Sequence, residues 1–443
     1  MTLPAHRSVA SPIQEPPRYA SYPTASRFGE DVGAERFDDW LAALPPGAAV
    51  ALHLHVPFCR RLCRFCCCRT QAVNRLGPLE AYLAALHGEI ERAARRLPAG
   101  VRVVEVHWLG GSPTILTPAM MRELDRHVRG ALPVAKGAGL TAEIEPHGVD
   151  AERLEALLGA GLRRARLGLQ DFAPRVQRAI DREQDAARVA ATVAALRGRG
   201  VAIDADLLYG LPLQDRASVE ATCAVVAALA PERVGLVGYA HVPWMAKRQR
   251  AICEDSLPGL RARRAQFFAA AAALRRAGYV RCGLDHFARP GDALAEAAAA
   301  RALRRDLLGY CERAPDAVIG LGAASISRFA QGYVQNVAGT GAYMARIAAG
   351  GGAGVRGAAL RLEDRVRARA IEMLLCERAV DLERLVATFG DFAGVIEPDL
   401  DRAAERFAGR TRRMASGLSV DDDGPLLARA VAHMLDARAA RAA

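Results

Sequence analysis

The sequence of 443 residues lacks several features that would assign it to a specialised class of protein. Its most apolar run, AQFFAAAAAL at residues 265–274, falls well short of a membrane-spanning helix. The first 28 residues are rich in proline and serine and contain no apolar segment typical of a signal peptide. These absences predict a cytoplasmic protein that is neither secreted nor inserted in a membrane.

The chain also lacks any block of five or more basic residues, although its formal net charge is +11. The excess charge comes almost entirely from arginine, which is dispersed along the whole chain. Binding of nucleic acid or of a membrane surface generally requires basic residues gathered in a patch. We therefore expect neither partner, while the charge remains compatible with a small polyanionic substrate.

The ten cysteines are distributed unevenly, since five of them lie in the ten-residue stretch CRRLCRFCCC. In the cytoplasm such a cluster indicates metal or redox chemistry more often than disulfides. Cys59, Cys63 and Cys66 have the spacing C-x3-C-x2-C, and no second cysteine pair exists to complete a usual four-ligand zinc site. Three thiolates can hold three irons of a 4Fe–4S cluster and leave the fourth iron open. The alternative is a zinc site completed by His55 or Cys68.

Short β-type runs alternate with amphipathic helical patterns through the first half of the chain, which predicts a parallel sheet. Six such units indicate an α/β fold, a partial (β/α)6 barrel with a curved parallel sheet. The predicted strands are 49–56, 101–108, 140–146, 164–170, 201–210 and 233–241. The predicted helices between them are 78–97, 118–131, 151–160, 186–198 and 217–229, with longer helices at 260–278 and 292–304.

Composition divides the chain into three parts. Residues 1–45 contain many turn-forming residues and predict an irregular N-terminal arm. Residues 46–350 form the predicted catalytic domain, and the glycine-rich run AAGGGAGVRG marks its end. Residues 355–443 are charged and amphipathic, which predicts a small, mainly helical C-terminal domain.

Polar, glycine or cysteine residues stand at the carboxyl end of every predicted strand. In β/α barrels the active site is built from these strand ends. The pattern therefore predicts one shared site. Its members along the chain are the cysteine run, Gly110, Gly111, Glu143, Glu145, Gln170, Asp204, Asp206 and the segment GYAH.

The spacing C-x3-C-x2-C after a first strand, with a Gly-Gly turn after the second, resembles the radical S-adenosylmethionine (SAM) superfamily. Further segments narrow the resemblance to the oxygen-independent coproporphyrinogen III oxidases. They are RYASYPTASRF, HLHVPFCRRLCRFCCC, HWLGGSPT, LGLQDFAPRVQRAIDREQ, DADLLYGLP, YAHVP and LDHFARP, in nearly collinear order from about residue 18 to 380.

This resemblance implies an enzyme of haem biosynthesis that converts two propionates of coproporphyrinogen III to vinyl groups, giving protoporphyrinogen IX. It implies a 4Fe–4S cluster and two SAM molecules as cofactors. The partners it implies are the tetrapyrrole substrate, an electron donor and an electron acceptor, and we expect a monomer. Arg289, in the segment HFARP, is one candidate to bind a substrate carboxylate.

The resemblance also implies roles for individual residues. Cys59, Cys63 and Cys66 are the expected cluster ligands, and Cys68 is an expected catalytic residue that does not bind iron. Glycine allows close backbone approach, carboxylate and amide groups suit an ammonium or ribose hydroxyls, and arginine suits a carboxylate. The expected SAM-binding residues are His53, Gly110, Gly111, Ser112, Glu143, Gln170, Arg182, Asp206, Ala240 and, for the second SAM, Ile326.

The chain departs from the usual pattern of the family at several of these positions. Tyrosine is usual where His53 stands, and His is smaller and can titrate near neutral pH. The other departures are Leu109 for glycine, Ser112 for threonine, Cys67 for a small residue, and Asp306 and Leu308 in a stretch that usually carries Asn and Gln. They leave open a diverged paralogue, either a haem chaperone or a haem-modifying methyltransferase; a zinc-stapled RNA-binding protein is the remaining alternative.

Overall fold

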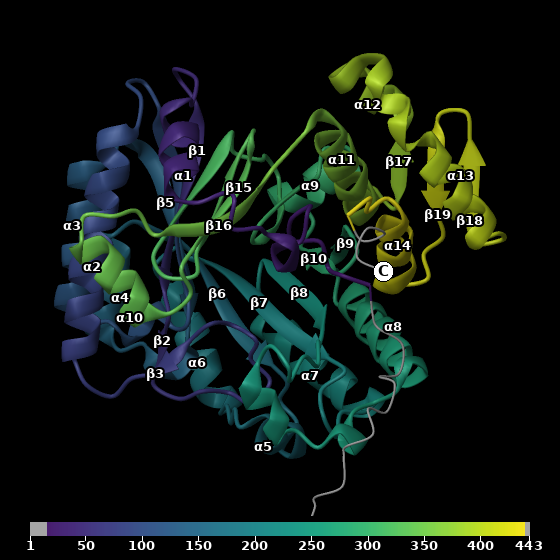
Figure 1. Cartoon of the computed structure of the whole chain (residues 1–443). Helices are drawn as coiled ribbons and strands as arrows, with labels where there is room; N and C mark the ends of the chain where they lie inside the picture. The colour runs from purple at the N-terminus through teal and green to yellow at the C-terminus, as the bar shows by residue number, and fades with distance from the viewer. Residues whose placement is uncertain (1–15, 439–443) are drawn as a thin grey trace, which may run out of the picture.

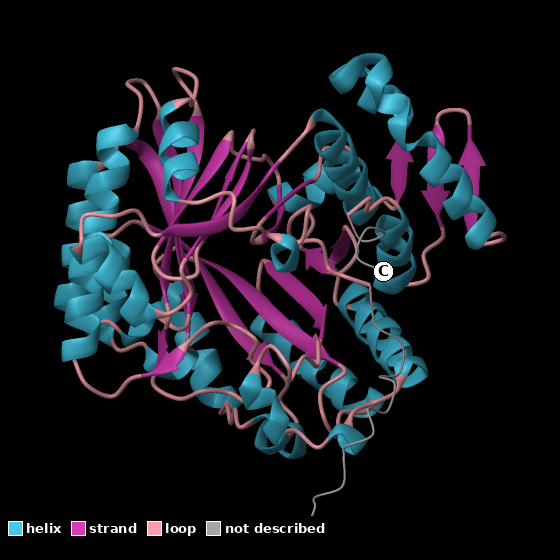
Figure 2. Cartoon of the chain, in the orientation of Figure 1, coloured by secondary structure: helices cyan, strands magenta, loops and turns pink. Residues whose placement is uncertain are grey.

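The computed structural model describes residues 16–438 and contains a curved sheet of twelve strands (Figures 1 and 2). Six neighbouring strands in its middle pair in parallel, in the order in which they occur in the chain. They are β1 (Ala49–Val56), β4 (Arg102–Gly110), β5 (Val134–Ile144), β6 (Leu162–Gln170), β7 (Ala202–Tyr209) and β8 (Arg233–Gly238). The predicted partial α/β barrel is therefore confirmed.

Helices connect the parallel strands and cover the outer face of the sheet (Figure 2). Several begin at a residue whose side-chain oxygen accepts a hydrogen bond from the first turn, as Thr117 does from the Met120 amide at 3.2 Å. The buried faces of all of them except α5 contribute to one large core shared with the sheet, and α5 packs in a small separate cluster. These helices are α2 (Gly77–Arg96), α3 (Pro118–Ala131), α4 (Ala151–Gly159), α5 (Pro174–Ile180), α6 (Ala186–Arg197), α7 (Arg216–Leu229) and α8 (Leu260–Arg276).

The sheet extends on both sides of the six parallel strands. Beside β1, β13 (Ala317–Leu321) pairs in parallel, and β14 (Ile326–Phe329), β15 (Gly332–Asn336) and β16 (Gly354–Ala359) continue antiparallel. Beside β8 lie β10 (His286–Ala288) and β9 (Val280–Cys282). The main sheet thus runs to Ala359, beyond the boundary that the sequence predicts at 350–355.

The N-terminal arm is not irregular throughout, because residues Ala34–Ala42 form helix α1. This helix buries Phe37 and Trp40 against Phe329, with ring centroids 5.8 and 6.1 Å apart. The prediction of a wholly irregular arm is therefore wrong for this segment, whose order depends on a tertiary contact 290 residues away in the chain. Residues 1–15 of the predicted arm lie outside the described residues.

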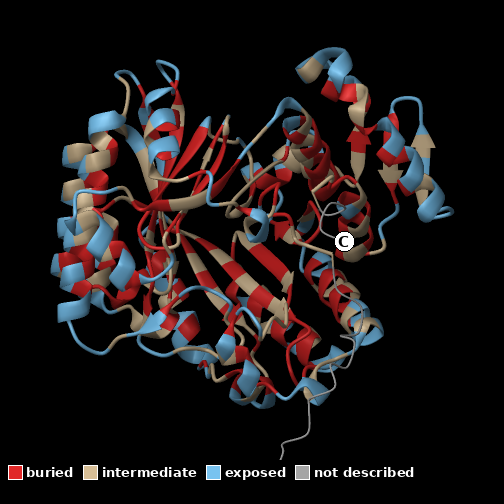
Figure 3. Cartoon of the chain, in the orientation of Figure 1, coloured by how far each residue is buried: buried red, intermediate tan, exposed pale blue. Residues whose placement is uncertain are grey.

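The C-terminal part packs around its own apolar cluster and is mainly helical, with a small sheet at its edge (Figures 1 and 3). Its helices are α11 (Leu362–Glu377), α12 (Leu382–Phe389), α13 (Glu397–Arg406) and α14 (Pro425–Met434). The sheet has the order β17 (Ala379–Asp381), β19 (Gly417–Val420), β18 (Thr411–Met414). The remaining strands and α-helices are β2 (Phe58–Cys59), β3 (Gln71–Ala72), α9 (Ala293–Ala299), β11 (Arg304–Asp306), β12 (Gly309–Cys311) and α10 (Thr340–Ala348).

Within residues 16–438 no helix has the length and apolar character needed to cross a bilayer.

A buried carboxylate joins four of these elements behind the barrel. Glu89 of α2 accepts hydrogen bonds of 2.7 Å from the Gly322 amide, the Asn336 side chain and the Tyr343 hydroxyl. Burial raises the pKa of Glu89, and these donors lower it. The network fixes the β13–β14 turn, β15 and α10 against α2.

We expect Glu89→Ala to lower the free energy of unfolding by about 2 kcal/mol, because three buried donors lose their acceptor at once. The exposed Glu80→Ala on the same helix is the matched control and should change it by less than about 0.5 kcal/mol. Urea denaturation of both variants measures the difference. Equal stability of the two variants would contradict a stabilising role for the network.

Candidate active site

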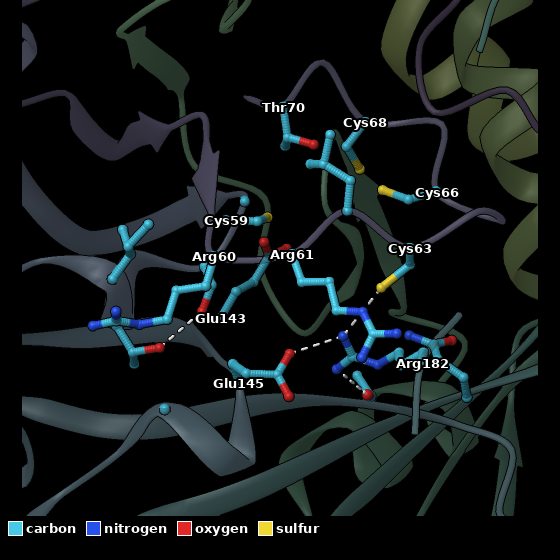
Figure 4. A pocket seen from close by; sticks show the side chains of 18 of the residues that line it. Cys59, Arg60, Arg61, Cys63, Cys66, Cys68, Thr70, Glu143, Glu145 and Arg182 are labelled. Atoms are coloured by element: carbon cyan, nitrogen blue, oxygen red, sulfur yellow. Dashed lines mark hydrogen bonds and ion pairs between the residues drawn. The ribbon is translucent and has the colours of Figure 1, made fainter. Parts of the chain in front are cut away.

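A cavity of about 440 Å³ lies at the carboxyl ends of the parallel strands, between the cysteine run and β4 to β7 (Figure 4). Side chains far apart in the sequence meet there because the carboxyl ends of parallel strands lie at one edge of a sheet. Most of the predicted site residues line it. They are Cys59, Cys63, Cys66, Cys68, Gly110, Gly111, Ser112, Glu143, Gln170, Arg182 and Asp206.

The cysteine run is held to the barrel by backbone contacts. Strand β2, which ends at Cys59, pairs with β3, and the Arg64 amide donates to the Ile180 carbonyl at 2.9 Å. Gln249 donates to the Phe65 carbonyl at 2.7 Å, and Arg248 donates to the Thr70 carbonyl at 2.9 Å. These bonds keep the thiols at the cavity although the segment has little secondary structure.

The three predicted ligand thiols differ in acidity. Burial raises the pKa of Cys59 to about 12 and also raises the pKa of Cys63. A hydrogen bond from Cys68 lowers the pKa of Cys66 to about 7. Because a metal binds the thiolate form, binding at this site releases protons.

The Gly-Gly turn after β4 requires glycine for reasons of packing. A Cβ atom on Gly111 would lie 2.2 Å from the Phe58 carbonyl oxygen, and Gly110 has a φ of +114°. The amides of Gly111 and Ser112 donate to the carbonyls of Val56 and Phe58 at 2.9 and 2.8 Å. The turn therefore lies directly against the strand that leads into the cysteine run.

Three charged side chains share the floor of the cavity. Glu143 on β5 accepts a hydrogen bond of 3.0 Å from the Gly110 amide, and burial raises its pKa. Arg166 on β6 lowers the pKa of Glu143 and lies 3.6 Å from the Asp206 carboxylate on β7. A single half-buried guanidinium thus balances two carboxylates from neighbouring strands.

Arg182 points into the cavity and is not a surface or helix-capping residue (Figure 4). It contacts the Glu145 carboxylate at 2.8 Å, the Gly168 carbonyl at 2.8 Å and the Cys63 sulfur at 3.6 Å. Its Nε atom is buried without a hydrogen-bond partner among the described residues. Gln170, at the end of β6, is held beside it with a left-handed φ of +56°.

Three predicted SAM-binding residues do not line this cavity. His53 lies buried within β1, edge-to-face with His107 at 4.9 Å between ring centroids, and burial holds its pKa well below the ordinary value. The Ala240 carbonyl accepts a hydrogen bond of 3.1 Å from Gln249, and Ala240 is not among the residues that line the cavity. Ile326 packs in a separate apolar cluster with Phe28, Tyr333 and Ala358.

Arg289 is also placed differently from the expectation. Its neighbour Ala288 pairs with Arg233 at the amino end of β8, and the Arg289 amide donates to the Glu232 carbonyl. The predicted carboxylate clamp therefore lies at the opposite end of the barrel, because β10 runs antiparallel to β8.

Sequence reasoning predicted Glu145, which lines the cavity, but missed other charged residues there, among them Arg166 and Arg248. A signal existed for Arg166, since it lies on the same strand as Gln170 at an even spacing of four positions. Arg248 lies in a loop after the sixth strand and carries no local signal.

The residues present fit an iron–sulfur cluster with a chelated amino acid group. Within residues 16–438 no three His, Cys, Asp or Glu side chains converge as the ligands of one metal ion do. A 4Fe–4S cluster instead binds each thiolate to a different iron, so its ligands need not meet at one point. The cysteines, the two-glycine turn and the Glu143 carboxylate supply thiolate, space and a negative charge in one cavity.

Comparisons with known proteins agree with this geometry. The family model of the radical SAM superfamily matches residues 54–226. An oxygen-independent coproporphyrinogen III oxidase of Paracoccus denitrificans is 45% identical over 421 residues, which are 95% of this chain and 93% of the relative. The enzyme of that name from Escherichia coli is 35% identical over 82% of this chain and 80% of its own.

A solved structure of coproporphyrinogen III oxidase from Escherichia coli, described as a radical SAM enzyme, has the same fold over most of its length. Its TM-score is 0.89 at 33% identity, and the match covers 95% of this chain and 97% of that one. These matches replace the alternative of an RNA-binding protein with a structural zinc site. The chain belongs to the family of oxygen-independent coproporphyrinogen III oxidases within the radical SAM superfamily.

Proposed function

We propose that this enzyme converts two propionate side chains of coproporphyrinogen III to vinyl groups without oxygen, giving protoporphyrinogen IX. The observation that carries the proposal is the convergence of Cys59, Cys63 and Cys66 with Glu143 and Arg182 on one cavity. Each propionate loses carbon dioxide, one hydrogen atom and one electron, so an external electron acceptor completes the reaction. A diverged paralogue with different chemistry is the alternative outcome of the test below.

The chain's own residues bind and orient the cofactors in this proposal. Cys59, Cys63 and Cys66 hold the 4Fe–4S cluster, and Glu143, with its carboxylate fixed by the Gly110 amide, binds the SAM ammonium group. Arg182 orients the SAM carboxylate, and it gives up part of its contact with Glu145 when it does so. Bound there, the cluster and SAM supply one-electron chemistry that removes hydrogen from an unactivated carbon.

The substrate carries four carboxylates, and arginine is the side chain that binds such groups in two-point fashion. Arg60 and Arg61 follow the first cysteine, line the cavity and are exposed at its mouth. We infer that they meet carboxylates of the tetrapyrrole. In this proposal Arg60 and Arg61 take the place of Arg289, because Arg289 lies at the opposite end of the barrel from the cavity.

The test is anaerobic incubation of cluster-reconstituted protein with SAM, dithionite and coproporphyrinogen III, followed by chromatography of the tetrapyrroles. Formation of protoporphyrinogen IX together with 5′-deoxyadenosine supports the proposal. Release of 5′-deoxyadenosine without a vinyl product would assign the chain to a paralogue of different substrate.

The cellular setting belongs to the same proposal. We infer a cytoplasmic monomer that uses one or two SAM molecules and a separate electron donor and acceptor. Light scattering of the purified protein measures the oligomeric state, and titration with SAM measures the number of binding sites. A second SAM site near Ile326 predicts two sites per chain, and Ile326→Asp should then remove one of them.

Glu143→Gln is expected to weaken SAM binding about tenfold, because a charged hydrogen-bond acceptor becomes neutral. The same change should stabilise the protein at neutral pH. Burial raises the pKa of Glu143 above its ordinary value of 4.5, so the ionised carboxylate opposes folding once pH exceeds that value. The gain should vanish below pH 4.5, where Glu143 is protonated in both states.

Calorimetric titration with SAM and thermal unfolding at several pH values measure the two effects of Glu143→Gln. Glu152→Gln, an exposed substitution on α4, is the control for both. Unchanged SAM affinity in Glu143→Gln would contradict the assigned contact.

A further inference from the structure

The outer side of the cysteine run carries an exposed basic surface that the cavity does not use. Arg64 and Arg69 lie within or beside the cysteine spacing. Lys247 and Arg250 lie in the loop segment after β8, within its short 3-10 helix Lys247–Ala251, and all four side chains are exposed. None of them lines the cavity, unlike Arg60 and Arg61. Among residues 16–438 the structure records no ion pair for these four side chains. We call them the outer basic patch.

The two segments of the outer basic patch are bound to each other. Arg248 donates to the Thr70 hydroxyl at 3.0 Å and to the Thr70 carbonyl at 2.9 Å. Gln249 is fully buried and donates to the Phe65 carbonyl at 2.7 Å. These bonds lie next to Arg69, Lys247, Arg250 and Arg64 in the chain, so the two segments that carry the four charges lie side by side.

A large apolar group is exposed in the same loop. Trp244 is 67% exposed and Met245 is 49% exposed, and Trp244 is the most exposed of the large apolar side chains in the described chain. Folding stability gives no reason to leave an indole in water. An exposed tryptophan close in the chain to exposed basic residues such as Lys247 and Arg250 is instead typical of a protein–protein contact, in which aromatic and arginine side chains carry most of the binding energy.

The position of the patch limits the partners that it fits. Arg64 lies between two of the predicted cluster ligands, Cys63 and Cys66, so a protein seated on the patch lies beside the cluster-binding segment. Electron tunnelling weakens steeply with distance, and the proposed reaction needs electrons from outside the chain. Positive charge around the contact selects a partner with a negative surface and speeds its association.

We propose that the outer basic patch with Trp244 and Met245 is the docking surface for an acidic electron-carrier protein. The inference rests on the proposed function, because it assigns the route of the electron which that function requires. In each transfer the carrier is oxidised by one electron and the cluster held by this chain is reduced by one electron. No atom is exchanged.

The experiment measures binding of purified flavodoxin, an acidic single-electron carrier, to the cluster-reconstituted full chain by surface plasmon resonance. The association rate should fall at least about tenfold between about 0.05 M and 0.5 M salt, because screening removes the electrostatic attraction. Arg64→Glu/Arg69→Glu should lower the association rate at low salt by about tenfold or more. Trp244→Ala should raise the dissociation rate by about tenfold.

The matched control is Arg122→Glu/Arg126→Glu, which reverses two exposed arginines on α3 outside the patch. It should bind flavodoxin within about twofold of the unaltered protein at moderate salt. Iron content and the visible spectrum of every variant verify that the cluster is loaded. Product formation with dithionite, which needs no docking, should remain unchanged in the patch and Trp244 variants.

The outcomes separate the two proposals. If dithionite supports no vinyl formation even in the unaltered protein, the proposed function fails. If dithionite supports it, and flavodoxin binding is absent or equally weakened by the α3 control, the docking proposal fails. Tighter binding of RNA than of flavodoxin, abolished by the patch variants, would also overturn it in favour of a nucleic-acid surface.

Discussion

Cys59→Ala is expected to abolish both SAM cleavage and vinyl formation and to leave a nearly colourless protein. The thiol stands at the end of β2, which pairs with β3, and it lines the same cavity as Cys63 and Cys66. With two ligands remaining, iron content should fall from about four to below about one per chain after reconstitution. Iron analysis and the visible absorption spectrum measure this loss independently of activity.

Cys253→Ala provides the control for this prediction, since Cys253 is an exposed free cysteine outside the cavity. It should keep its iron, its colour and its turnover. A Cys59→Ala protein that still releases 5′-deoxyadenosine from SAM would show that the ligand assignment is wrong.

Arg166→Met is expected to lower the free energy of unfolding by about 3 kcal/mol, the largest stability effect that we predict. The substitution leaves the carboxylates of Glu143 and Asp206 in the cavity floor without the guanidinium that balances them. Chemical denaturation measures the change. Arg163→Met, at an exposed position near the start of the same strand, should cost less than about 0.5 kcal/mol.

The loss of unfolding free energy in Arg166→Met should depend on pH in a defined direction. Arg166 lowers the pKa of Glu143, so its removal raises that pKa further above the ordinary value of 4.5. A raised carboxyl pKa in the folded state means that stability falls as pH increases. The stability difference between Arg166→Met and the unaltered protein should therefore be largest at neutral pH and shrink toward pH 4.5.

A second substitution separates the charge effect from the loss of packing. Arg166→Met/Glu143→Gln should recover part of the lost stability, because one of the two unbalanced charges is gone. A deficit that is independent of pH and unaffected by Glu143→Gln would indicate that Arg166 acts through packing alone.

Local patterns were sufficient for the six parallel strands and for most of the helices between them. Helix α3 has the predicted bounds of 118–131, and β1 has the predicted bounds of 49–56. Proline at the helix start, alternation along strands and turn residues between elements are all encoded within a few positions. Helix α1 escaped prediction because its order depends on packing against Phe329.

The sequence also predicted part of the cavity. Residues at strand ends could be assigned to one site, since parallel strands bring their carboxyl ends together. The charge balance within the site could not be predicted. The pairing of Arg182 with Glu145, and of Arg166 with Asp206, joins strands and loops whose side-chain directions no local pattern specifies.

By itself the sequence determined the α/β class and the edge of the sheet at which the cavity lies, and it proposed Cys59, Cys63 and Cys66 as cluster ligands. These properties follow from spacing along the chain and from the fixed geometry of parallel strands. Only the tertiary structure decided that the sheet continues to Ala359, that His53 faces His107 in the interior, and that Arg289 lies at the far end of the barrel. Each of these depends on which distant strand pairs with which, and in which direction, and that choice is made by the packing of the whole core.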